Sequence, residues 1–75
     1  MASTPQIHYK QNRLKQLRAF CHAAQTGSIS EAAERLYLSQ PTVSLQIQAL
    51  ERELETVLFE RRGPKIKLTP EGETL

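Results

Sequence analysis

A chain of 75 residues can form one small domain, whose core leaves little margin of stability. The single cysteine excludes an internal disulfide and a cysteine-based zinc site, and no apolar run approaches the roughly 20 residues of a membrane-spanning helix. Residues 1–11 also lack the hydrophobic core of an export signal, so we expect a cytoplasmic protein. Because the net charge is only +2, the placement of the charges is more informative than their sum.

The N-terminal residues 1–11 (MASTPQIHYKQ) are polar and show neither helical nor strand periodicity, so we expect a flexible arm. A first helix is predicted over residues 12–26, with an apolar face formed by Leu14, Leu17, Phe20, Cys21 and Ala24. Cys21 lies in the middle of that face. We therefore interpret it as a small buried hydrophobic residue rather than a nucleophile.

A second helix begins at residues 28–31 (SISE), which match a capping box. In this motif Ser28 accepts the backbone N–H of Glu31, and the Glu31 side chain reaches back to Ser28. The inner face of this helix is formed by Ile29, Ala32, Ala33 and Leu36. Only a few residues separate it from the next helix, which indicates a helix-turn-helix over residues 28–47.

Residues 39–50 (SQPTVSLQIQAL) carry no charge in a chain that is 24% charged. Ser39 is the expected N-cap of a third helix over about residues 40–54, and proline is tolerated in its first turn. The back of this helix is an apolar stripe, and its front carries Pro41, Ser44, Leu45, Gln48 and Arg52. A neutral front of this kind suits contact with base edges, although a surface helix that merely lacks charges would have the same pattern.

Residues 57–61 (VLFER) and 65–68 (KIKL) are predicted to form a two-stranded hairpin around the turn at residues 62–64. A hairpin is marginal alone, so its apolar side chains are expected to pack on the helices. Residues 61–67 contain no acid and include Arg61, Arg62, Lys65 and Lys67. This basic cluster fits either nucleic-acid contact or a solvated turn.

Thr69 and Pro70 begin a well-capped helix that the chain follows only to Leu75. Because so short a helix is unstable alone, we expect residues 69–75 to be the start of a linker helix in a longer protein. Together the elements predict a mainly α fold, a three-helix winged helix-turn-helix over residues 12–68, with a two-stranded wing at residues 57–68. The wing would supply attraction to phosphates, and the third helix hydrogen bonds to bases.

The chain from residue 12 to residue 75 resembles the N-terminal domain of LysR-type transcriptional regulators. The motifs that carry this resemblance are AAERL at residues 32–36, SQP at 39–41, ALE at 49–51, LFER at 58–61 and LTPEG at 68–72. The resemblance implies a bacterial transcription factor that binds double-stranded DNA as a homodimer or higher homo-oligomer on a pseudo-palindromic operator. It also implies a dimerising linker helix and an effector-binding domain for a small molecule beyond this chain.

Carried over by position, the resemblance places Gln40, Pro41 and Ser44 close to the major groove. Leu45 and Gln48 are further candidates for base contact, because they share the front of the helix. The positions of Ser28 and Thr42 match those near phosphates, and Arg61 or Arg62 matches the reach of the wing toward the minor groove. Lys65 joins these as part of the basic cluster.

Two residues depart from the pattern of the family. Leu45 stands where relatives often have a basic residue, so it contacts a thymine methyl group, or Gln46 or Gln48 compensates, or it is an exposed leucine with little role. Glu55 stands where the family usually has the glycine that closes the third helix. Either Glu55 adopts a left-handed conformation at a cost on the order of 1 kcal/mol, or the helix ends differently.

Two other classes of function compete with DNA binding. A protein-interaction or dimerisation module could use the same scaffold, and it would bind DNA weakly with little dependence on salt. An enzyme is disfavoured, because the sequence has no paired histidine and carboxylate at a useful spacing and no glycine-rich phosphate loop. We expect neither a catalytic residue nor a metal or cofactor within this chain.

Overall fold

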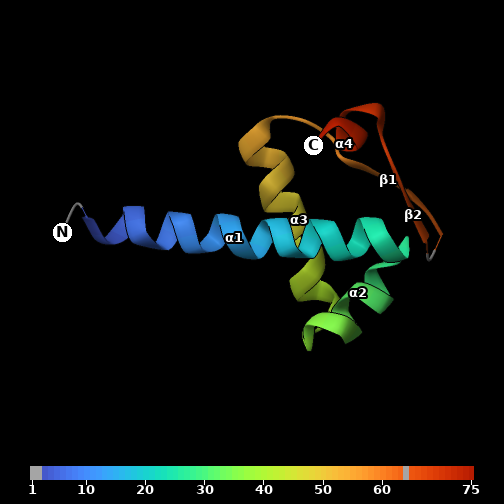
Figure 1. Cartoon of the computed structure of the whole chain (residues 1–75), viewed down its shortest axis with the longest axis horizontal. Coiled ribbons are helices and arrows are strands. Elements are labelled where there is room, and N and C mark those ends of the chain that lie inside the picture. The colour runs from blue at the N-terminus through green and yellow to red at the C-terminus, as the bar shows by residue number, and fades with distance from the viewer. Residues whose placement is uncertain (1–2, 64) are drawn as a thin grey trace.

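The computed structural model describes residues 3–63 and 65–75, with the side chains described from residue 13 onward. Helix α1 (Ser3–Thr26) crosses α3 (Gln40–Leu54), and α2 (Ile29–Leu36) packs against both (Figure 1). Strands β1 (Phe59–Arg62) and β2 (Lys65–Leu68) form an antiparallel hairpin, which is followed by α4 (Pro70–Thr74). The fold is the mainly helical winged helix-turn-helix that the sequence predicts.

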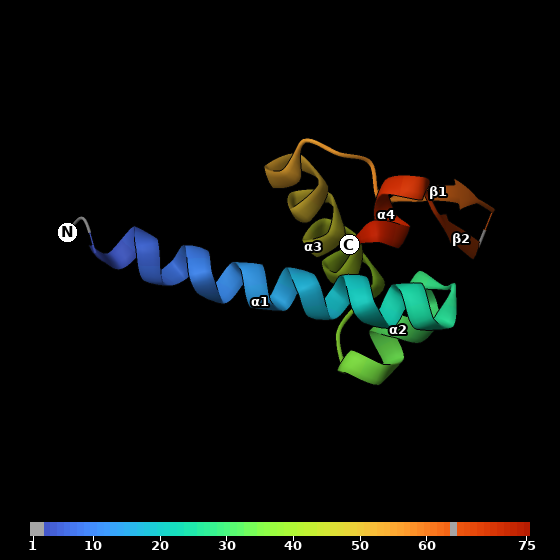
Figure 2. The ribbon, with the colours of Figure 1, turned by 45° about the horizontal axis from the view of Figure 1, so that its top comes forward.

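The first helix is longer than expected. Residues 1–11 were predicted to form a flexible arm without helical structure, whereas α1 begins at Ser3 and includes residues 3–11; residues 1–2 lie outside the described part of the chain. Pro5 does not prevent this start, since it falls in the first turn, where backbone N–H groups have no partner within the helix. In Figures 1 and 2 the N-terminal part of α1 projects beyond the other elements.

The buried face of α1 differs in part from the predicted one. Phe20 is buried and Leu17 and Ala24 are half-buried, as predicted. Leu14 is 60% exposed and Cys21 is exposed, whereas the buried residues are Gln16, Ala19, Phe20 and Ala23. Alanine at positions 19 and 23 lets α1 approach its neighbours closely, so these small residues face inward beside Phe20. The polar Gln16 is accommodated because its Nε2 donates to Glu53 Oε2 at 3.2 Å. The interpretation of Cys21 as a buried residue is therefore wrong.

The remaining core follows the predicted periodicities. It contains Ile29, Ala32 and Ala33 from α2, and the α3 stripe of Val43, Ile47 and Leu50. Leu58 and Phe59 of the hairpin region are buried beside them, and the Phe59 ring lies 5.2 Å from the Phe20 ring, centroid to centroid. The partly buried residues packed against this core are Leu17, Ala24, Leu36, Leu54, Ile66 and Leu68.

Two helices end on residues other than glycine in the left-handed conformation. Tyr37 closes α2 at φ 57° and ψ 42°, and Glu55 closes α3 at φ 53° and ψ 43°. The backbone N–H of Glu55 donates to the carbonyl of Arg52, which satisfies an otherwise unpaired end group. Of the two alternatives for Glu55, the structure therefore has the strained left-handed cap.

The hairpin is attached to the helices at both of its strands. Its register pairs Phe59 with Leu68 at the base and Arg62 with Lys65 near the tip; Pro64, in the predicted turn, lies outside the described residues. The N–H of Ile66 donates to the carbonyl of Gly27 at 3.1 Å, so β2 lies against the turn between α1 and α2. The wing is thus fixed relative to the helix-turn-helix.

The last helix starts as its sequence predicts. Thr69 Oγ1 accepts the N–H of Gly72 at 3.0 Å and donates to the carbonyl of Val57 at 2.6 Å, which ties the cap to the start of the hairpin. Within residues 3–63 and 65–75, no helix is long and apolar enough to cross a membrane.

Candidate nucleic-acid interface

The predicted front of the third helix is an accessible surface in the structure. The five candidates for base contact are accessible: Gln40, Pro41, Leu45 and Gln48 are exposed and Ser44 is half-buried; we call these five residues the front of α3. Arg52, which the prediction also placed on this side of the helix, is exposed one turn beyond Gln48. The helix begins as expected, because Ser39 Oγ accepts the backbone N–H of Thr42 at 3.2 Å and lies 2.8 Å from the Thr42 hydroxyl. Since Val43, Ile47 and Leu50 anchor the opposite side in the core, the front is held facing outward.

Ser28 caps α2, but the capping box is only half formed. Its Oγ accepts the N–H of Glu31 at 3.2 Å, as predicted. The Ser28 N–H donates to Thr26 Oγ1 at 3.3 Å, which takes the place of the expected Glu31 side chain. Ser28 also forms an isolated antiparallel bridge with Lys65 of β2, so these two candidate phosphate contacts lie side by side.

The two arginines of β1 have different surroundings. Arg61 Nη2 donates to Ser44 Oγ on the front of α3 at 3.0 Å. Arg62 Nη2 lies 3.7 Å from Glu60 Oε1, and both side chains are largely solvated. Successive side chains of a strand point to opposite faces, which explains why only one of the two reaches α3.

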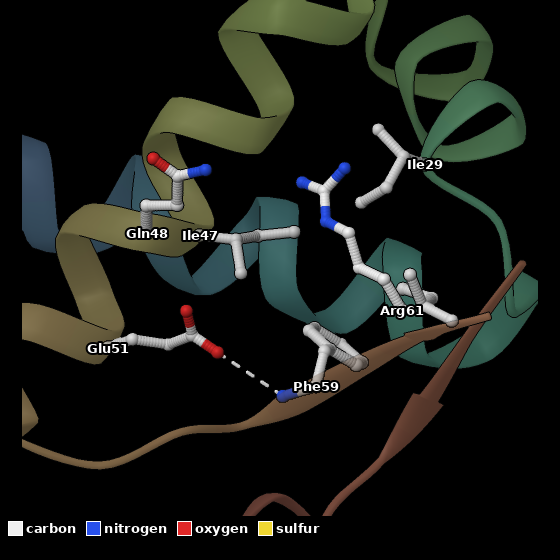
Figure 3. A pocket seen from close by; sticks show the side chains of 7 residues that line it. Ile29, Ile47, Gln48, Glu51, Phe59 and Arg61 are labelled. Carbon is white, nitrogen blue, oxygen red and sulfur yellow. Dashed lines mark hydrogen bonds between the residues drawn. The ribbon is translucent and has the colours of Figure 1, made fainter. Parts of the chain in front are cut away.

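Two hollows separate α2, α3 and the hairpin. The smaller has a volume of about 90 Å³, and Figure 3 shows the Arg61 side chain crossing it from β1 toward α3. The larger, of about 410 Å³, is lined by Gln40, Ser44 and Arg61 together with Ile29, Ser30, Gly63 and Ile66. The structure thus gathers part of the predicted front and part of the predicted wing around one groove.

A carboxylate that was not predicted as functional connects the two sides of this groove, α3 and the hairpin. Glu51 Oε2 accepts the backbone N–H groups of Leu58 at 2.8 Å and Phe59 at 3.2 Å, and Figure 3 shows the second of these bonds. The contact fixes the start of the hairpin against α3. The only signal in the sequence is the position of Glu51 in the ALE motif, which does not reveal its partner.

The other side of α3 carries Thr42 and has basic neighbours that the sequence reading left out. Thr42 and Gln46 line a hollow of about 280 Å³ with Leu36, Leu38, Lys15 and Arg18. Lys15 and Arg18 come from α1, and neither is among the residues predicted to contact DNA. Their proximity to Thr42 depends on how α1 crosses α3, which a local pattern cannot show.

Among the described residues, no group of three or more His, Cys, Asp or Glu side chains could hold a metal ion. The side chains on this surface include hydroxyl, amide and guanidinium groups. Such groups donate to and accept from base edges and phosphates.

A helix-turn-helix followed by a basic two-stranded wing defines this molecule as a winged helix-turn-helix protein. The sequence profile of bacterial regulatory helix-turn-helix proteins of the lysR family matches residues 14–73. This chain belongs to that family.

Its relatives include an uncharacterized HTH-type transcriptional regulator of Azotobacter vinelandii, 52% identical over 62 residues, which are 83% of this chain and 43% of that protein. A probable RuBisCO transcriptional regulator of Guillardia theta is also 52% identical over 62 residues, covering 83% of this chain and 20% of that protein. The chain therefore spans less than half the length of these two relatives.

Two solved structures of similar fold are complexes with DNA. The CbnR DNA-binding domain in complex with DNA has a TM-score of 0.78 and 43% identity, over 80% of this chain and 69% of that chain. The BenM DNA-binding domain in complex with catB site 1 DNA has a TM-score of 0.77 and 43% identity, over 81% and 68%.

Proposed function

We propose that this chain is the sequence-specific, double-stranded DNA-binding domain of a bacterial transcription regulator. The observation that carries the proposal is the exposed, uncharged front of α3 beside a basic wing fixed to it. The similar CbnR and BenM domains, whose structures contain DNA, support it.

In this proposal α3 enters the major groove, where the front of α3 faces the base edges. Glutamine and serine supply donors and acceptors there, and Leu45 supplies an apolar contact for a thymine methyl group. The phosphate backbone of the DNA is bound by hydroxyl and basic groups on both sides of α3. These groups belong to Ser28, Thr42, Arg61, Arg62 and Lys65. Arg62 and Lys65 lie opposite each other near the wing tip, which suits a reach toward the minor groove.

We also propose that the regulator acts as a homo-oligomer whose linker helix starts with α4. Two copies would then read the two halves of a pseudo-palindromic site, with the spacing set by the dimer. A small-molecule effector would bind outside this chain. The greater length of the curated relatives supports this part of the proposal.

A salt titration tests DNA binding directly. Fluorescence anisotropy of a labelled duplex, measured at two salt concentrations, is expected to show a steep loss of affinity, with a logarithmic slope of about −0.9 for each phosphate neutralised. The duplex is first obtained by selection from a random pool, which also gives the site, its symmetry and its spacing. Weak binding with little dependence on salt would instead favour a protein-interaction module.

A further inference from the structure

A hydrogen bond connects the wing to a residue that the proposed function places against the bases. Arg61 Nη2 donates to Ser44 Oγ at 3.0 Å, and Figure 3 shows the Arg61 side chain extended from β1 toward α3. Ser44 is half-buried, whereas the other members of the front of α3 are exposed. Arg61 therefore contacts the front of α3 already in the free protein.

The direction of this bond has a chemical consequence for Ser44. A serine hydroxyl has one proton to donate and two lone pairs to accept with, whereas a guanidinium can only donate. The contact with Arg61 therefore occupies one lone pair of Ser44 Oγ and leaves the hydroxyl proton directed away from the arginine. A charged donor also polarises the hydroxyl, because hydrogen bonds in a chain strengthen one another.

We propose that Arg61 is a positioning residue, which makes Ser44 a hydrogen-bond donor to a base, so that the pair selects the base at one position of the site. The inference rests on the proposed function. In the major groove guanine offers N7 and O6, adenine N7 and thymine O4 as acceptors, whereas cytosine offers an amino donor. The Ser44 hydroxyl is therefore expected to discriminate against cytosine at the position it faces.

The same strand contains a matched control. Arg62 follows Arg61 directly, but its guanidinium is 3.7 Å from Glu60 and its side chain is 70% exposed. Arg61→Ala and Arg62→Ala each remove one positive charge from β1. Only Arg61→Ala also removes the contact with Ser44.

The test compares base preference among five proteins: the wild type, Ser44→Ala, Arg61→Ala, Arg62→Ala and the double variant Ser44→Ala/Arg61→Ala. Each is used to select duplexes from a random pool. Its affinity is then measured for the preferred duplex and for the same duplex with cytosine at the affected position. The base preference is the ratio of these two affinities. Ser44→Ala is expected to lower this ratio by a factor of about three to ten, which corresponds to the free energy of one hydrogen bond. Arg61→Ala is expected to lower it at the same base pair, and the double variant no further than either single variant.

Two variants distinguish the positioning of Ser44 by Arg61 from a general attraction of the arginine charge to DNA phosphates. Arg62→Ala is expected to weaken all duplexes by a common factor and to reduce the salt dependence. Arg61→Lys keeps the charge but replaces the fork of donors by one ammonium group, so it is expected to restore overall affinity more than base preference. Thermal unfolding of each variant checks that folding is intact.

Three results would overturn the inference. In the first, Arg61→Ala lowers the affinity for all duplexes equally, as Arg62→Ala does. In the second, the two single variants have additive effects on base preference. In the first case Arg61 is a phosphate contact only, and in the second it affects base preference independently of Ser44. The proposed function stands in both cases. If the wild-type protein shows no salt-sensitive binding to any selected duplex, the proposed function fails together with the inference.

Discussion

Leu45 is 63% exposed in the middle of the front of α3, where a large apolar side chain gains nothing from the core. Its position suits contact with the methyl group of a thymine. We predict that Leu45→Arg weakens discrimination at one base pair and raises non-specific affinity, with a salt dependence steeper by about one phosphate contact. Selection from a random pool and salt titrations measure the two effects.

Val57→Arg is the control for Leu45→Arg. Val57 is 61% exposed and lies between α3 and β1, outside the front of α3, so the variant adds the same charge at a similarly exposed site. It is expected to leave the selected sequence unchanged. If Leu45→Arg also selects the wild-type sequence with undiminished discrimination, Leu45 has no part in recognition.

Glu55 stores conformational strain at the end of α3, because a side chain with a Cβ is disfavoured at φ 53°. We predict that Glu55→Gly raises the free energy of unfolding by up to about 1 kcal/mol, the relief of strain being offset in part by the flexibility of glycine in the unfolded chain. Chemical denaturation followed by circular dichroism measures the change.

Arg52→Gly is the control for Glu55→Gly, and its expected effect on the free energy of unfolding has the opposite sign. Arg52 is exposed and lies inside the helix that Glu55 closes, so glycine there is expected to lower the free energy of unfolding by about 1 kcal/mol. Effects of the same sign for both substitutions would contradict the assignment of strain to Glu55.

At the level of the elements, Glu51 connects α3 to the wing through two backbone N–H groups. We predict that Glu51→Ala lowers the free energy of unfolding by about 1 to 3 kcal/mol, because it leaves the partly buried N–H groups of Leu58 and Phe59 without their acceptor. Glu51→Gln is expected to cost less, since an amide oxygen still accepts. Denaturant titrations give both values.

Glu60 is the matched carboxylate for this prediction. It is exposed on β1, and its contact with Arg62 is a solvated ion pair of the kind that contributes little. Glu60→Ala is expected to change the free energy of unfolding by less than about 0.5 kcal/mol. A loss as large as that of Glu51→Ala would mean that charge, and not the two backbone bonds, explains the effect.

For the whole molecule, the sequence predicts the elements better than their contacts. The second, third and last helices were predictable, because caps at Ser28, Ser39 and Thr69 mark their starts. Regular apolar spacings mark the hairpin and the inner faces of α2 and α3. The N-terminal extent of α1 was not predictable, because residues 3–11 are polar, contain a proline and have no apolar periodicity that would indicate a helix.

The prediction of which face of α1 is buried was wrong in part, because it relied on the same local pattern. Leu14 and Cys21 weigh more in an apolar pattern than Ala19 and Ala23, yet the alanines are the residues that allow close packing. The contacts that build the groove are non-local as well: Arg61 and Ser44 are 17 positions apart. Sequence reading could therefore name the surface residues, but not which of them touch.

Each strand of the hairpin has an N–H group that is bound to the rest of the domain. On the β2 side the N–H of Ile66 is bound to the carbonyl of Gly27, and on the β1 side the N–H of Phe59 is bound to Glu51. Unpaired strand edges are templates on which another chain can add a strand, and they promote aggregation. At these positions another copy of the protein finds no free donor for such pairing, which limits the length of edge on which a strand could add.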